Sequence, residues 1–120
     1  MSVVKVIDFS SGPHEWEHRR LADLPKSVVL ADPHHKAVTR YDSGEISLSA
    51  GTWISTPRRW HAFTDRDEFC VILKGHVCLI AKDGNAQTFK TGDSFLIPNG
   101  FEAYEDVLET TAKHYVIRSE

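Results

Sequence analysis

The residues best suited to chemistry in this sequence are histidines and glutamates, and one group of them stands near the N-terminus. The stretch His14-Glu15-Trp16-Glu17-His18 has the H-E-x-x-H spacing. On a helix this spacing places both histidines on one face for zinc, with the glutamate as general base. The segment from Pro13 to Leu24 has helical character, so a short helix is expected there. No convincing third ligand follows, and the sequence therefore favours a plain surface helix over a metalloprotease.

A second candidate is Glu68, which directly precedes an apolar run at 69–73. A carboxyl that is partly removed from water has a raised pKa and can act as a general acid or base. A buried carboxylate otherwise needs hydrogen-bond partners, and the sequence offers His61, Tyr104 and His114 for that role. Glu68 is thus predicted to be either a catalytic residue or a buried carboxylate held by such a partner.

Short apolar runs separated by turn signals must position these side chains. Strands are expected at 36–41, 45–53, 69–73, 76–81, near 89, and at 95–97 and 115–117, with turns at 42–44, 83–85, 91–93 and 98–100. About eight closely spaced strands with hardly any helix predict an all-β sandwich or barrel. We expect residues 1–35 to form an N-terminal arm and residues 36–120 to form the barrel domain.

Composition narrows the possible partners. The chain has 120 residues, 14 basic and 17 acidic, which is typical of one soluble domain and gives no electrostatic footprint for nucleic acid. No apolar run approaches the length of a membrane helix, and no secretory signal is expected. Cys70 and Cys78 lie in apolar runs, which favours buried free thiols in a reducing cytoplasm. A homodimer is expected, because exposed sheet edges favour pairing and dimers are the commonest assembly.

Two segments carry a resemblance to a known family. The first runs from Asp67 to Gly75 and places a glutamate seven residues before a glycine; the second runs from Gly92 to Phe101 and reads G-x5-P-x-G. Together they resemble the two motifs of the cupins, the RmlC-like jelly-roll β-barrels. With Gly51-Thr52-Trp53 and the closing stretch 113–117, residues 45–118 resemble the small cupins grouped with the ureidoglycine aminohydrolase cupin domain and the EutQ-type cupins.

The resemblance implies where a metal would bind. Metal-binding cupins present H-x-H, a glutamate three or four residues later, and a histidine after the P-x-G, a set that suits Mn, Fe, Ni or Zn. Glu68 stands at the glutamate position. The histidine positions fall on Ala62 and Thr64 with the shorter gap, or on His61 and Phe63 with the longer one, and the last falls on Ala103. The resemblance therefore implies an incomplete metal site, with His61 and Glu68 as ligands if a metal binds at all.

Three functions stay open on this basis. The leading hypothesis is a cytoplasmic cupin that binds a small polar metabolite in the barrel near Glu68, and no cofactor is expected. The residues predicted to line this ligand site are Trp53, His61, Phe63, Phe101, Tyr104 and His114. The second hypothesis is a metal-dependent hydrolase or isomerase acting on a ureido or amino compound through His61 and Glu68. The third is a non-catalytic structural or regulatory module.

Overall fold

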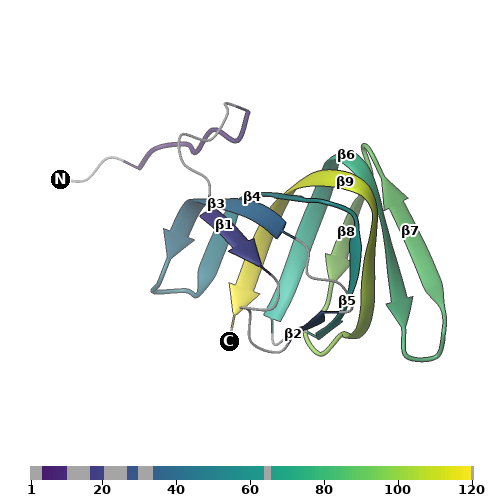
Figure 1. Cartoon of the computed structure of the whole chain (residues 1–120). Coiled ribbons are helices and arrows are strands. Elements are labelled where there is room, and N and C mark those ends of the chain that lie inside the picture. The colour runs from purple at the N-terminus through teal and green to yellow at the C-terminus, as the bar shows by residue number, and fades with distance from the viewer. Residues whose placement is uncertain (1–3, 11–16, 21–26, 30–33, 64–65, 120) are drawn as a thin grey trace.

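The computed structural model describes residues 4–10, 17–20, 27–29, 34–63 and 66–119, and within these it does not describe the side chains of 17–20, 27–29, 34–35, 60–63 and 103. The described residues form nine strands and no helix (Figure 1). The strands are β1 (Glu17–Arg20), β2 (Ser27–Val29), β3 (His34–Ser43), β4 (Leu48–Ser55), β5 (Arg58–Phe63), β6 (Arg66–Ala81), β7 (Ala86–Lys90), β8 (Ser94–Ile97) and β9 (Glu102–Ser119).

Two long strands, β6 and β9, organise the sheet. They pair antiparallel along nearly their whole length, from Arg66 opposite Ser119 to Ala81 opposite Ala103. The other edge of β9 pairs with β4 in its second half and with β5 in its first half. The sheet continues from β4 to β3 and β1, and from β5 to β2, while β6 also pairs with β7 and β8. Figure 1 shows β6 and β9 curving together over one end of the barrel, so that both halves of each strand face one interior.

The bend in β6 depends on Gly75. This residue has a φ of 120°, a region that favours glycine, and the register with β9 shifts on both sides of it. A Cβ at this position would collide with the fully buried side chain of Thr111. The Thr111 hydroxyl accepts a hydrogen bond from the backbone N–H of His76 at 3.0 Å. The expected separate strands at 69–73 and 76–81 are therefore one strand bent at a glycine.

The turns expected from the second motif are confirmed. Gly92 has a φ of 92°, and the Asp93 carboxylate accepts a hydrogen bond from the backbone N–H of Lys90 at 2.9 Å. The Phe101 N–H donates to the carbonyl of Pro98 at 3.2 Å, which closes the 98–100 reversal. This turn is tied to the start of β6, because the Asn99 N–H donates to the Asp67 carboxylate at 2.8 Å.

The N-terminal segment differs from the expectation. The part of the expected helix that the structure describes, residues 17–20, is strand β1, paired with the edge of β3 from Glu17 opposite Ala37 to Arg20 opposite His34. The helix prediction is wrong for these residues, because an open strand edge offers backbone partners that a short isolated helix lacks. The rest of that helix, including His14, lies outside the described residues. Without a helix at His18, the zinc-helix interpretation loses its premise.

The core lies inside the curve of β6 and β9 and is completed by β8. Its buried residues are apolar except for one thiol: Cys70, Ile72, Val77, Leu79, Phe95, Ile97 and Val107. Cys70 is a fully buried free cysteine, as expected, whereas Cys78 is free but only half-buried. Among the described residues, no helix is long and apolar enough to cross a membrane.

Candidate functional site

Charged side chains enter the barrel interior from β6 and β9. Alternation along a strand puts every second residue on one face. On β6 this face carries Glu68 next to the core residue Cys70, and on β9 it carries Glu105 and Lys113. Glu105 and Lys113 are buried and Glu68 is nearly so: their side chains are 10% (Glu105), 7% (Lys113) and 13% (Glu68) exposed. We call Glu68, Glu105 and Lys113 the barrel cluster.

Lys113 holds the cluster together. Its Nζ donates a hydrogen bond to Glu68 Oε2 over 3.1 Å. The Cys70 thiol donates to the same oxygen over 3.2 Å. Nζ also lies 3.9 Å from Glu105 Oε1 and 4.6 Å from the centre of the Trp53 ring, within the range of a cation–π contact. The ammonium therefore contacts two carboxyl groups and an aromatic face.

The surroundings shift the pKa values of Glu68 and Glu105 in opposite directions. Burial alone would raise the pKa of Glu68, but the Lys113 ammonium and the hydrogen bonds from Cys70 and Lys113 outweigh it and lower the pKa below its usual value. Burial raises the pKa of Glu105, the Glu68 charge adds to that effect, and Lys113 offsets it only in part. Glu68 is therefore the ionised partner of Lys113, and Glu105 loses its proton at a higher pH than Glu68.

The same surroundings also shift the pKa values of Lys113 and Cys70. Burial would lower the pKa of Lys113, but Cys70 and the two glutamates raise it well above its usual value. The ammonium is thus a fixed positive charge and not a nucleophile at neutral pH. Burial raises the pKa of the Cys70 thiol, so Cys70 serves the cluster as a hydrogen-bond donor.

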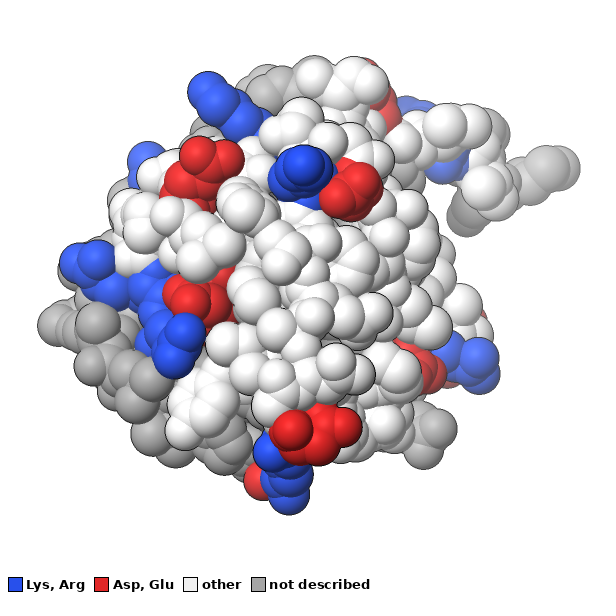
Figure 2. Space-filling model, turned by 90° about the vertical axis from the view of Figure 1, so that its right-hand side faces the viewer, with Lys and Arg blue, Asp and Glu red and all other residues white. Residues whose placement is uncertain are grey.

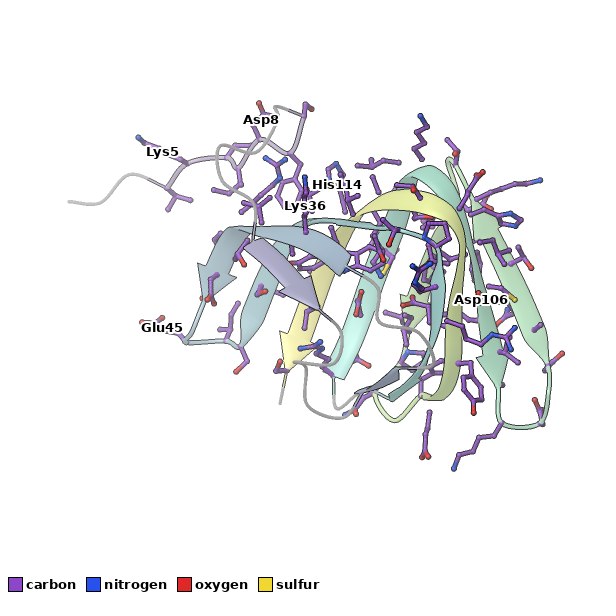
Figure 3. All side chains as sticks on the ribbon, viewed as in Figure 1. Lys5, Asp8, Lys36, Glu45, Asp106 and His114 are labelled. Atoms are coloured by element: carbon purple, nitrogen blue, oxygen red, sulfur yellow. The ribbon has the colours of Figure 1, made fainter. Side chains whose placement is uncertain are left out.

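The partner of Glu68 differs from those the sequence offered. Among the described residues, Lys113 and Cys70 form hydrogen bonds with the Glu68 carboxylate, and Tyr104 and His114 do not. Tyr104 lies on the face of β9 opposite to Glu105 and is 38% exposed. His114 lies on the outer face of the sheet, where its Nδ1 is 2.9 Å from Thr52 Oγ1 and its ring meets the edge of Phe9. Figure 3 shows His114 on the side of the sheet that faces the segment with Asp8.

The aromatic residues expected around the ligand lie in different places. Trp53 is in register with Lys113 and shares its face, so its ring lies beside the barrel cluster. Phe101 lines a cavity of about 320 Å³ between β6, β7, β8 and the 98–101 turn. His61 and Phe63 are in register with Tyr104 and Glu102 on β9, but their side chains are outside the described part of the structure. As ligand contacts, all of these residues stay predictions.

The described residues do not fit a divalent metal at Glu68. A cation already stands beside this carboxylate, because the Lys113 ammonium is 3.1 Å from Oε2. A divalent ion ligated by that oxygen would meet the like charge of Lys113 in a buried site, where such repulsion is strong. Within the described part of the chain, no three His, Cys, Asp or Glu residues gather as a metal-ligand group.

Sequence reasoning missed Lys113 and Glu105. The alternation of Lys113 with Tyr115 and Ile117 was a usable signal, because an inward Tyr115 requires an inward Lys113. Glu105 alternates in the same way with Val107, which is fully buried. Neither signal shows that the two residues meet, since eight positions separate them on one strand. The curvature of β9 supplies that contact.

Comparison with known proteins identifies the family and agrees with the fold. Residues 43–115 match the family model described as the EutQ-like cupin domain. The comparison with curated proteins gives no match. Among solved structures, the EutQ proteins of Salmonella typhimurium and Clostridium difficile are each 19% identical, with TM-scores of 0.63 and 0.64. The alignments cover 70% and 72% of this chain and 68% and 69% of those proteins.

Two further neighbours extend the likeness. A protein of unknown function from Pseudomonas syringae has a TM-score of 0.78 and 19% identity; the alignment covers 92% of this chain but only 46% of that protein. A protein from Thermotoga maritima is 31% identical over 53% of this chain and 73% of its own length, with a TM-score of 0.52. At these identities and coverages the structural likeness concerns the fold.

Proposed function

The chain belongs to the EutQ-like cupin family, and from this premise we propose that it binds a small polar metabolite inside the barrel, against the barrel cluster and without a complete metal site. The observation that carries the proposal is the burial of three ionisable groups, Glu68, Glu105 and Lys113, in one interior. Taking such groups out of water costs several kcal/mol each, and buried groups with shifted pKa values gather at functional sites.

The chemistry of the cluster suits binding better than metal catalysis. Glu68 and Lys113 form a fixed ion pair with opposite hydrogen-bonding character, and Glu105 adds a carboxyl that can donate or accept. Trp53 provides an aromatic wall beside the ammonium. The metal-dependent hydrolase or isomerase finds no support in the described donor set, because Lys113 competes with a divalent ion for Glu68.

The test is a binding screen on the purified chain. Amino acids, amides, amines, hydroxy acids and sugars are screened by thermal shift, and positives are measured by calorimetry. A true ligand present at 100 times its Kd stabilises the fold by about 2.7 kcal/mol, a rise of several degrees in Tm for a domain of this size. Glu68→Gln should abolish the shift, whereas Glu109→Gln at an exposed position of β9 should keep it. The absence of any ligand would favour the non-catalytic structural module.

We also propose that the chain works as a homodimer in a reducing cytoplasm. The free cysteines are consistent with such a compartment. On the outer face, Leu96, Phe69 and Val116 are cross-strand neighbours on β8, β6 and β9 and are 57%, 44% and 39% exposed. A twofold axis through this row would pack it against the same row of a second copy, so one surface patch would form both sides of the dimer interface. On the face drawn in Figure 2, basic and acidic groups lie close to one another and not in a block of one sign.

Light scattering on an eluting column tests the dimer. The wild type should elute with twice the mass of the chain, and Phe69→Lys should elute as a monomer. Leu108→Lys, at an exposed apolar position away from this row, should remain a dimer. A monomeric wild type would contradict the proposal.

A further inference from the structure

A cavity of about 320 Å³ is lined by residues of β6, β7 and β8, and some of these neighbour the barrel cluster in the sheet. Its walls are mainly apolar and aromatic, with Leu79, Phe89, Phe95, Ile97 and Phe101 among its lining residues and Gln87 as the polar side chain. Phe89 and Phe95 stack with their ring centres 4.2 Å apart. A volume of this size accommodates a single ring with a short substituent.

Register connects the wall of this cavity to the charged groups. Three of its wall residues are direct cross-strand partners of residues at the cluster: Leu79 of Glu105, Ile97 of Glu68, and Phe95 of Cys70. Directly opposed side chains on one face of a sheet have Cβ atoms about 5 Å apart. The wall of the cavity therefore adjoins the residues that carry the two carboxyl groups.

Glu105 is the incompletely satisfied member of the cluster. It is 8% exposed, and its Oε1 lies 3.9 Å from Lys113 Nζ, beyond hydrogen-bond distance. Within the described part of the chain, its carboxyl forms no hydrogen bond. The Lys113 ammonium is engaged with Glu68 at 3.1 Å. A buried carboxyl without a hydrogen bond costs free energy until a partner arrives.

We propose that Glu105 and the adjoining cavity bind an organic ammonium compound, with its charged group at Glu105 and its apolar or aromatic body in the cavity. This rests on the proposed function and names the ligand class. The charge of the cluster favours a cationic ligand. Two carboxyl groups share one ammonium, so a second cation balances their charge, whereas an anion is repelled by Glu68 and Glu105. The aromatic walls select a body that is apolar.

The protonation of Glu105 supports this assignment. Burial raises its pKa and the Lys113 ammonium lowers it only in part, so the charge of this carboxylate is incompletely compensated in the free protein. The groups that face it among the described residues are Lys113 on its own strand and Glu68 and Cys70 on β6. A bound ammonium stabilises the ionised form, so binding should lower the pKa of Glu105.

Four probes test the proposal by calorimetry at neutral pH. Benzylamine carries both features, benzyl alcohol and methylamine carry one each, and benzoate reverses the charge. Benzylamine should bind about tenfold more tightly than benzyl alcohol or methylamine, because a charge-assisted hydrogen bond and the ring both contribute. Benzoate should bind most weakly. Glu105→Gln should bring benzylamine to the level of benzyl alcohol, and the matched Glu109→Gln should change nothing.

A second variant tests the cavity. Gln87 lies at an exposed position on the rim, so Gln87→Trp should fill the cavity without disturbing the core and weaken the binding of benzylamine and benzyl alcohol. Benzoate or benzyl alcohol binding as tightly as benzylamine would overturn the ammonium class while leaving barrel binding intact. Binding of none of the probes would overturn this inference, and the proposed function would fall only if the metabolite screen also gave no ligand.

Discussion

Lys113 and His114 are neighbours in sequence but lie on opposite faces of β9. Lys113 enters the barrel, where it pairs with Glu68 and contacts Trp53. His114 lies outside, where it contacts Thr52 and the ring of Phe9, and Arg40 stands over the same ring. Burial and the nearby Arg40 lower the pKa of His114. One step along a strand thus separates the interior charged groups from an outer contact that places Phe9 against the sheet.

The largest expected effect is the loss of free energy of unfolding on replacing the interior residue Lys113. Lys113→Met leaves Glu68 and Glu105 buried without their cation, and breaking a buried ion pair costs about 3–5 kcal/mol. Urea unfolding measures this as a lower free energy of unfolding. Lys82→Met removes an exposed pair with Glu102 and should cost at most about 1 kcal/mol. Equal losses in the two variants would mean that Lys113 is not buried with its partners.

Glu105 should give the interior a pH dependence. Its folded pKa is raised above 4.5, so the native state holds a proton that the unfolded state has lost. The stability from Glu105 is complete below 4.5 and falls as pH rises toward the folded pKa, by about 1.4 kcal/mol per pH unit in that window. Unfolding of the wild type and of Glu105→Gln between pH 4 and 8 should show curves that diverge; parallel curves would contradict the raised pKa.

The outer position should give the smallest effect. His114→Phe keeps an aromatic ring against Phe9 but removes the hydrogen bond with Thr52. The loss of one partly exposed hydrogen bond should lower the free energy of unfolding by about 1 kcal/mol. Ligand binding in the barrel should be unchanged, and a loss of binding comparable with that of Glu68→Gln would place His114 functionally with the interior.

The fold could be predicted from a few residues with strict backbone demands. Gly75, Gly92 and the 98–100 turn have the conformations that their types suggest, and the β strands between them follow from alternation. Strand β5 and the early part of β9 were missed, because their polar residues hide the pattern. The strand at 17–20 was also missed, because its pairing with β3 is a tertiary contact that local helical character does not reveal.

The site was only half predictable for the same reason. Glu68 and Trp53 were expected inside, and both lie at the barrel cluster. Residue type alone favours histidine and tyrosine over lysine as partners of Glu68, since a buried lysine is rare without a carboxylate beside it. Which residues meet inside a curved strand depends on long-range register, and the register of β6 with β9 shifts around Gly75. No local pattern specifies that shift.

The most direct test of this account is a titration of the glutamate carboxyl carbons by NMR in the wild-type protein. Glu68 should titrate below 4.5 and Glu105 above it, because Lys113 stabilises the charge of Glu68 and burial disfavours the charge of Glu105. The two groups interact, so the measured values describe the pair. Both carboxyls titrating together near 4.5, as exposed glutamates do, would contradict the buried cluster and the function proposed from it.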